Sequence, residues 1–291
     1  MTLVRTPTGI DVRNILHRYG IHPNKSLGQN FLTDETALQQ VVDAAQIHPG
    51  EVVLEIGPGL GSLTRLLSER ARRVMAVELD GRLIPPLKEV LATYPNVQIV
   101  QGDILALHPV ELMQETGSER TPDYLVVANI PYYITSALVR HLLETSQPPQ
   151  RLVLTVQRQV AERICAAEGK MSLLALSVQI YGRPQAAAYI PASAFYPPPK
   201  VDSAVIRVDL HPQPRIPKHL LTSFFRLAKA GFSQKRKTLR NSLAGGMRWT
   251  PQQAEDRLNQ VGIDPKRRAE TLSLEEWREL AESLQHLTPE N

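Results

Sequence analysis

Two short motifs carry the residue types best suited to chemistry in this sequence. The first, residues 55–61 (EIGPGLG), is a glycine-rich turn that follows an apolar run. Glycines let such a turn bend sharply and let its backbone approach a ligand closely. The second, residues 129–132 (NIPY), joins a side-chain amide, a carbonyl next to a rigid proline and an aromatic face. Together, in this order, they predict methylation of an amino group on a planar base.

Three polar side chains end or follow apolar runs elsewhere in the first half of the chain. Glu78 ends one run, Asp103 follows another, and Asn129 follows a third. The carboxyl ends of parallel strands meet at one edge of an open α/β sheet, where ligands bind. There Glu78 can accept hydrogen bonds from ribose hydroxyls and Asp103 from an adenine amino group. Glu78 would serve a nicotinamide cofactor equally well, and Asp103 as a simple turn former remains an alternative.

The apolar pattern predicts a largely parallel sheet with helices on both faces. The expected strands are 51–56, 73–77, 97–100, 124–128 and 152–156, with a closing pair at 186–190 and 204–210. The expected helices of this part are 62–70, 82–92, 136–143 and 171–179. Residues 29–32 look like a loop before a helix capped by Thr33 or Asp34.

Both ends of the chain differ from this sheet region. The first two dozen residues are polar, and we expect them to be loosely ordered apart from a short helix at 12–19. Residues 211–217 (HPQPRIP) mark a domain joint. Beyond it, helical patterns at 220–230, 235–243, 251–261 and 274–284 predict a small bundle.

Composition narrows the functional classes. The chain has 291 residues, 42% hydrophobic and 21% charged, as in ordinary globular proteins. Its one cysteine, Cys165, excludes an intrachain disulfide and suits a reducing compartment. No run approaches the roughly 18 apolar residues of a membrane span, and no signal-peptide pattern opens the chain. The eight histidines are scattered, so we expect no metal site. The single cysteine, with no signal-peptide or membrane-span pattern, leads us to expect a cytoplasmic location.

The charge of the chain is unevenly distributed. Net charge is only +4, but residues 215–240 contain no Asp or Glu. The basic residues of this stretch are Arg215, Lys218, Arg226, Lys229, Lys235, Arg236, Lys237 and Arg240. Such a stretch attracts polyanions, with a solvated helix face as the alternative.

Several separate motifs occur in the order found in one family. They are residues 26–32 (SLGQNFL), 55–61 (EIGPGLG), 102–104 (GDI), 129–132 (NIPY), 195–203 (FYPPPKVDS) and 232–241 (FSQKRKTLRN). From about residue 24 to 245, the chain resembles the ribosomal RNA adenine N6-dimethyltransferase family. The resemblance is to its small-subunit type, linked to kasugamycin sensitivity. One departure is Lys170-Met171, where family members often carry an aromatic-glycine pair.

The resemblance implies a Rossmann-like class I methyltransferase with a mostly parallel seven-stranded sheet and a small C-terminal all-α domain. We therefore expect an N-terminal extension at 1–24, a methyltransferase domain at 25–211 and a helical RNA-binding domain at 217–291. The implied methyl donor is S-adenosyl-L-methionine. Its implied contacts are Gln29, Asn30, Leu32, Gly57, Gly59, Glu78, Asp103 and Asn129.

The resemblance also implies the substrate and its contacts. Asn129 and the carbonyl of Ile130 or Pro131 would accept hydrogen bonds from the adenine amino group, and Tyr132 and Phe195 would stack on the flipped base. Phe195 as a core aromatic is the alternative. The implied RNA grip is Lys235, Arg236, Lys237 and Arg240.

The expected reaction is dimethylation of N6 on two adjacent adenosines near the 3′ end of 16S ribosomal RNA. We expect it to occur in an immature small subunit, as part of subunit biogenesis, with the enzyme acting as a monomer. Three rivals remain: a macrolide-resistance methyltransferase acting on large-subunit RNA, a non-catalytic assembly or transcription factor, and a nicotinamide-dependent oxidoreductase.

Overall fold

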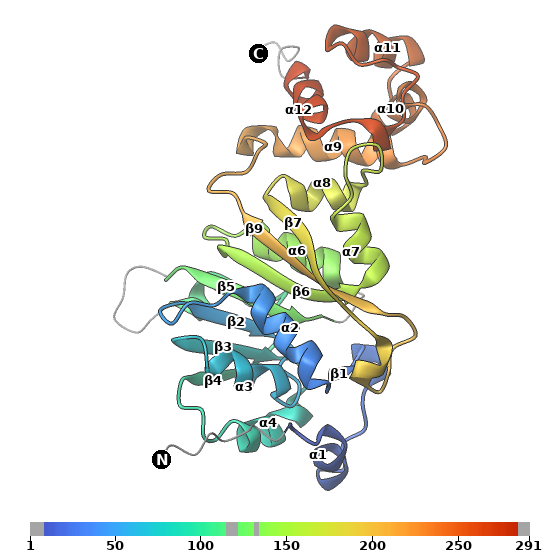
Figure 1. Ribbon diagram of the computed structural model, residues 1–291. Coiled ribbons are helices and arrows are strands. Elements are labelled where there is room, and N and C mark those ends of the chain that lie inside the picture. Colours follow the sequence, from blue (N-terminus) through green and yellow to red (C-terminus); the bar gives the residue numbers. More distant parts are fainter. Residues whose placement is uncertain (1–8, 115–121, 131–133, 285–291) are drawn as a thin grey trace. The chain divides into compact units, whose positions relative to one another are not determined.

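The computed structural model describes residues 9–114, 122–130 and 134–284 (Figure 1). The described chain forms two compact units. The first contains the residues up to Ala161 and Pro184–Leu210, and the second contains Glu162–Arg183 and the residues from His211 onward. The first contains the sheet and the second is helical. No helix in the described ranges is both long and apolar enough to cross a membrane.

A seven-stranded sheet forms the first unit. Its strands, in spatial order, are β4 (Val97–Gln101), β3 (Arg73–Glu78), β2 (Val52–Ile56), β5 (Tyr124–Asn129), β6 (Arg151–Gln157), β9 (Ser203–Leu210) and β7 (Gly182–Ile190). The first five are parallel to their neighbours, and β9 runs antiparallel to β6. The prediction of a mostly parallel sheet with a closing pair at one edge is confirmed.

The register aligns the carboxyl ends of the central strands. Ile56 at the end of β2 pairs with Val77 on β3 and with Ala128 on β5. Glu78, the last residue of β3, pairs with Gln101 at the end of β4. The glycine turn and the polar residues that follow these strands therefore lie along one edge.

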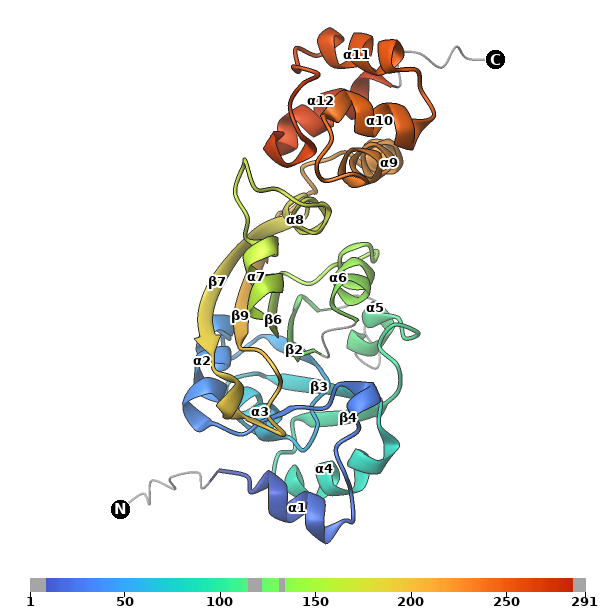
Figure 2. The ribbon, with the colours of Figure 1, turned by 90° about the vertical axis from the view of Figure 1, so that its right-hand side faces the viewer.

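Helices cover both faces of the sheet, which explains the continuous apolar runs of its central strands. Figure 2 shows α2 and α3 on one side of the sheet and α5 and α6 on the other. Leu38, Val41 and Leu67 pack with Val53 and Val127 in one buried cluster. The helices of this part are α2 (Glu35–Ala45), α3 (Ser62–Ser68), α4 (Ile84–Val90), α5 (Pro109–Met113) and α6 (Thr135–Leu143). Helix α7 (Arg158–Ile164) begins in this part, and the division after Ala161 falls within it.

The short helix expected at 12–19 is confirmed, and the residues that follow it are ordered as well, with Ile21 buried. The expectation of a loosely ordered segment is therefore wrong for residues 20–24. Helix α1 (Val12–Arg18) begins at Asp11, whose carboxylate accepts a hydrogen bond from Asn14 N–H at 3.0 Å. Val12 and Leu16, one turn apart, are buried against Phe31. Burial of these two side chains, with Ile15 packed beside them, stabilises a helix whose remaining residues are polar.

A second, two-stranded sheet lies beside the first. Strand β1 (Phe31–Leu32) pairs antiparallel with β8 (Phe195–Tyr196), which places Leu32 opposite Phe195. Each strand has two residues, too few to show an alternating pattern. This pairing joins two of the sequence motifs, 26–32 and 195–203.

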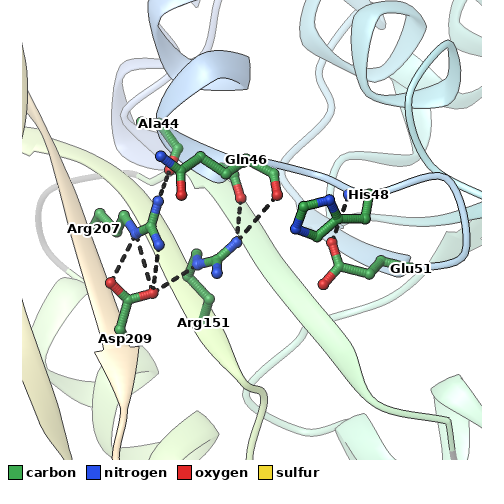
Figure 3. A network of polar contacts seen from close by, with 8 residues as sticks. Ala44, Gln46, His48, Glu51, Arg151, Arg207 and Asp209 are labelled. Carbon is green, nitrogen blue, oxygen red and sulfur yellow. Dashed lines mark hydrogen bonds and ion pairs between the residues drawn. The ribbon is translucent and has the colours of Figure 1, made fainter.

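An arginine pair holds the end of α2 against the sheet (Figure 3). Arg151 donates to Ala45 O at 2.6 Å and to Asp209 Oδ1 at 2.7 Å. Arg207 donates to Ala44 O at 3.3 Å and to Asp209 Oδ2 at 2.8 Å. Although burial raises the pKa of Asp209, the hydrogen bonds from both arginines bring it below its ordinary value. Cations beside the last carbonyls of a helix donate hydrogen bonds to them and interact favourably with the negative end of the helix dipole.

The second unit contains α8 (Leu173–Gln179), α9 (Leu221–Phe232), α10 (Leu239–Met247), α11 (Pro251–Gln260) and α12 (Leu274–Ser283). Residues 162–183, which we expected in the first domain, belong to this unit. Met171 N–H donates to Glu270 O at 3.1 Å, and His211 N–H donates to Tyr181 O at 2.8 Å. These bonds attach the segment to the helices that follow residue 211.

The expected helix at 235–243 begins later than its pattern indicates. Helix α10 starts at Leu239, and Thr238 before it has an extended backbone (φ −64°, ψ 156°). Residues 233–238 form a loop after α9. The N-terminal end of a helix dipole is positive, so three cations at 235–237 would destabilise a helix that began there. This favours a loop at these residues.

Candidate active site

One pocket lies along the carboxyl edge of the sheet. It is lined by the ends of β2, β3 and β5, the turn after β4, the segment 27–32 and Phe195. All residues predicted to contact the cofactor line it: Gln29, Asn30, Leu32, Gly57, Gly59, Glu78, Asp103 and Asn129. Residues separated widely in the chain therefore meet in one cavity.

The glycine turn forms the floor of the pocket. Gly57 and Gly59 have φ values of 72° and 59°, in the left-handed region that side chains disfavour. A methyl group added at Gly59 would lie 2.9 Å from the ring of Phe31. Glycine at these positions lets the turn adopt this conformation and leaves no side chain between the backbone and a ligand.

Glu78 is buried, with 6% of its surface exposed. Its two carboxylate oxygens accept hydrogen bonds from Gly59 N–H at 3.0 Å and from Asp80 N–H at 2.8 Å. Burial raises the pKa of Glu78, and these backbone hydrogen bonds counter part of that rise. The bonds fix the carboxylate while each oxygen keeps a lone pair for a hydroxyl donor.

Gln29 has partners on both sides of its amide. Its nitrogen donates to Asp80 Oδ2 at 2.8 Å, and its oxygen accepts from Asn24 N–H at 2.7 Å. Asp80 is buried and also accepts two hydrogen bonds from the Arg82 guanidinium, at 2.9 and 2.6 Å. These bonds lower the pKa of Asp80 to about 2. Asp80 has no sequence signal except its position two residues after Glu78, and sequence reasoning missed it.

Asn129 is held by residues 28–30, which also line the pocket. Its amide nitrogen donates to Asn30 O at 3.1 Å, and the Asn30 amide donates to Gly28 O at 3.0 Å. Within the described ranges, no group donates to the Asn129 side-chain oxygen. That oxygen is suited to accept from a substrate amino group. Pro131 and Tyr132 lie outside the described residues.

Asp103 and Phe195 both line the pocket but also have structural partners. Asp103 is exposed and accepts a hydrogen bond from Leu105 N–H at 2.9 Å, as a turn former does. Phe195 is 4% exposed and packs in the core cluster with Leu32 and Leu38. Asp103 as a turn former and Phe195 as a core aromatic, the alternatives considered from the sequence, therefore each describe part of what these side chains do.

Glu55 is a further pocket residue whose environment the sequence did not reveal. It is 1% exposed, and its Oε2 atom has no hydrogen-bond partner in the described chain. Burial raises the pKa of Glu55 to about 8. A buried carboxyl group without a full set of partners is costly, and a ligand that donates to it removes that cost.

The predicted RNA-binding residues lie in the helical unit and differ in exposure. Lys235, Arg236 and Lys237 are exposed in the loop before α10. Arg240 is partly buried and donates to Glu255 Oε2 at 2.9 Å. Across the described residues, no group of three His, Cys, Asp or Glu side chains has metal-binding geometry.

The chain matches the family described as ribosomal RNA adenine dimethylase over residues 21–286. It is 45% identical over 269 residues to ribosomal RNA small subunit methyltransferase A of Dehalococcoides mccartyi, covering 92% of this chain and 90% of that protein. A protein of the same name from Bacillus mycoides is 42% identical over 277 residues, 94% of each chain. The crystal structure of 23S rRNA methyltransferase ErmE superposes with a TM-score of 0.69 at 28% identity, covering 88% of this chain and 100% of that one. The chain belongs to the ribosomal RNA adenine dimethylase family.

Proposed function

We propose that this enzyme dimethylates the N6 amino group of two adjacent adenosines near the 3′ end of 16S ribosomal RNA, with S-adenosyl-L-methionine as the methyl donor. As a member of its family it is an rRNA adenine dimethyltransferase. The small-subunit substrate follows the names of relatives at 42–45% identity. The observation that carries the site assignment is the Asn129 carboxamide, oriented by Asn30 O in a pocket that also contains Glu78.

The pocket fits an adenosyl cofactor on structural grounds. Because Gly57 and Gly59 have no side chains, the turn would let the methionine end approach closely, and Glu78 would accept from the ribose. The unpartnered Oε2 of buried Glu55 offers an acceptor for a donor group of the ligand. Asp103 would hold the adenine amino group. When bound, the cofactor supplies an electrophilic methyl group on a sulfonium.

Asn129 would make the adenine amino nitrogen able to react. This nitrogen is a poor nucleophile because its lone pair is delocalised into the ring. Hydrogen bonds accepted from the NH2 group by Asn129 Oδ1 and the Ile130 or Pro131 carbonyl favour a pyramidal nitrogen with a directed lone pair. Fixed acceptors and alignment supply most of the acceleration in such a site. This scheme needs no dedicated general base, because the proton can leave after transfer.

The base and the RNA would be held by different groups. Tyr132 and Phe195 would contact the flipped adenine, each stacking contact worth roughly 1–3 kcal/mol. Lys235, Arg236 and Lys237 would neutralise phosphates and set the register on a folded RNA. We propose an immature small subunit as the substrate particle, a monomeric enzyme and a cytoplasmic location.

The rivals differ in testable ways. The large-subunit alternative has support in the ErmE structure, at lower identity than the small-subunit relatives. The assembly-factor alternative predicts particle binding without transfer. The oxidoreductase alternative gives no role to the Asn129 carboxamide, which Asn30 O orients in the pocket.

The test is transfer of labelled methyl groups from S-adenosylmethionine to immature small subunits that lack adenine dimethylation, with nucleoside analysis of the product. We expect N6,N6-dimethyladenosine at adjacent positions, and a loss of about 10²–10³-fold in rate for Asn129→Ala. Asn14→Ala removes an amide outside the pocket and serves as the control. Label only in large-subunit RNA would assign the chain to the resistance class, and binding without transfer to the assembly factors.

A further inference from the structure

Helix α9 has two distinct faces. Phe224, Leu227 and Ala228 are buried inside the helical unit. Arg226 and Lys229 are exposed, and with Thr222 and Ser233 they follow the spacing i, i+4, i+7, i+11 of a single helix face. The apolar face holds the helix in place while the other presents two cations to solvent.

These two cations continue into the loop after the helix. Helix α9 ends at Phe232, and the exposed residues Lys235, Arg236 and Lys237 follow at once. Lys237 N–H donates to Gln234 O at 3.0 Å, which turns the loop. We call Arg226, Lys229 and residues 235–237 the α9 surface.

No member of the α9 surface has an ion pair in the described part of the chain. Four other arginines in the described part of the same unit do have carboxylate partners. The pairs are Arg240–Glu255, Arg267–Glu276, Arg268–Glu270 and Arg278 with Glu275 and Glu282. The pairs of Arg240 and Arg267 join separate elements of the unit. The five clustered cations of the α9 surface instead repel one another until an anionic partner binds.

The α9 surface has no exposed large apolar side chain beside its cations, and this indicates which kind of anionic partner it binds. The large hydrophobic side chains that are exposed in the described chain are Tyr19, Leu79, Tyr189 and Val201, all of them outside the helical unit. A helix that binds a membrane surface needs an exposed apolar face beside its basic one, and the apolar face of α9 is buried. Phosphates of a folded RNA need only the cations.

We infer that the α9 surface is one continuous RNA-backbone contact, with Arg226 and Lys229 as phosphate ligands, and that Arg240 acts instead as a structural link to α11 through Glu255. Side chains three apart on a helix lie about 5–6 Å apart at Cβ, so Arg226 and Lys229 reach separate phosphates. This inference rests on the proposed RNA substrate and extends it from the loop to the helix.

The experiment measures binding of the full-length protein to immature small subunits over a range of KCl concentrations, by filter retention. For Arg226→Gln/Lys229→Gln, the slope of log K against log salt should become shallower by about 2, one for each lost phosphate contact. The charge-preserving Arg226→Lys/Lys229→Arg should keep the parent slope. Arg70→Gln/Lys88→Gln removes two exposed cations, one in the turn after α3 and one in α4, and should also keep it.

An unchanged slope for Arg226→Gln/Lys229→Gln, with circular dichroism and melting like those of the parent, would overturn the inference. So would loss of binding to phosphatidylserine vesicles in that variant while particle binding stayed the same. Arg240→Gln should lower the melting temperature and leave the slope within experimental error; a slope shallower by one would show that Arg240 contacts phosphate. Methyl transfer measured in parallel distinguishes failure of this inference from failure of the proposed function. Transfer together with an unchanged salt slope for Arg226→Gln/Lys229→Gln refutes only the role of α9.

Discussion

The side-chain nitrogen of Gln29 lies 2.8 Å from Oδ2 of Asp80, so one hydrogen bond joins the segment before β1 to the end of β3. Asp80 in turn donates its N–H to Glu78, whose other oxygen accepts from Gly59. A chain of hydrogen bonds therefore runs from the pocket wall at residue 29 to the glycine turn. Its central member, Asp80, is absent from the residues that the family motifs indicate.

Replacing Asp80 tests this chain of bonds. In Asp80→Asn the acceptor loses its charge, and its bonds to Gln29 and Arg82 weaken by about 1–3 kcal/mol in total. We expect the segment around Lys25, which is exposed, to be cut faster by trypsin, and binding of S-adenosylhomocysteine by calorimetry to weaken. Asp43→Asn on the exposed side of α2 is the control. Parent-like proteolysis and binding in Asp80→Asn would show that Asp80 does not position the segment.

Glu55 predicts an unusual dependence of stability on pH. Its folded pKa of about 8 lies above the ordinary value of 4.5, so between these values the folded state holds a proton that the unfolded state releases. The free energy of unfolding should therefore fall as pH rises from about 5 to 8, by at most about 1.4 kcal/mol per pH unit. Glu55→Gln carries no proton to lose and should flatten the profile in urea unfolding. The exposed Glu69→Gln should keep the parent slope. Identical slopes for Glu55→Gln and the parent would contradict the assignment.

Phe195 can be tested for packing and stacking separately. Because it is 4% exposed, Phe195→Ala should destabilise the protein by about 3–5 kcal/mol. Phe195→Leu keeps most of the apolar volume and should cost under about 1.5 kcal/mol. If the ring also stacks on adenine, Phe195→Leu should lose about 1–3 kcal/mol in kcat/KM, with melting close to that of the parent. Unchanged kcat/KM would leave Phe195 a core residue only.

Two glycines of the helical unit make a matched pair. A Cβ at Gly231 would lie 2.5 Å from the ring of the buried Trp277, whereas the nearest atom at Gly245 is 3.9 Å away. Gly231→Ala should destabilise the unit by about 1–3 kcal/mol through overpacking. Gly245→Ala, in the exposed part of α10, should stabilise it by about 0.4–1 kcal/mol. Thermal unfolding distinguishes the two, and equal effects would show that α9 and α12 are not packed this closely.

Much of the fold and of the pocket could be predicted because the signals are local. The apolar run ending at Ile56 and the glycines after it predict a strand and a turn from neighbouring residues alone. The parallel arrangement then brings Glu78 and Asn129 to the same edge.

What the sequence could not show depends on contacts between distant segments. The pairing of Leu32 with Phe195 involves two-residue strands. The buried state of Glu55 depends on helices that cover the sheet. Arg240 belongs to a uniformly basic stretch in sequence, and only the approach of α11 supplies its carboxylate partner Glu255.

The arginine pair on α2 has a consequence for motion at the pocket. At its start, α2 is capped by Asp34, which accepts from Ala37 N–H at 2.8 Å, and at its end by Arg151 and Arg207 (Figure 3). Hydrogen bonds at both ends therefore hold α2 in a fixed position. Thr33 and Asp34, just before α2, also donate their N–H groups to Ala194 O, so any movement of residues 27–32 at the pocket has to take place on the N-terminal side of Thr33.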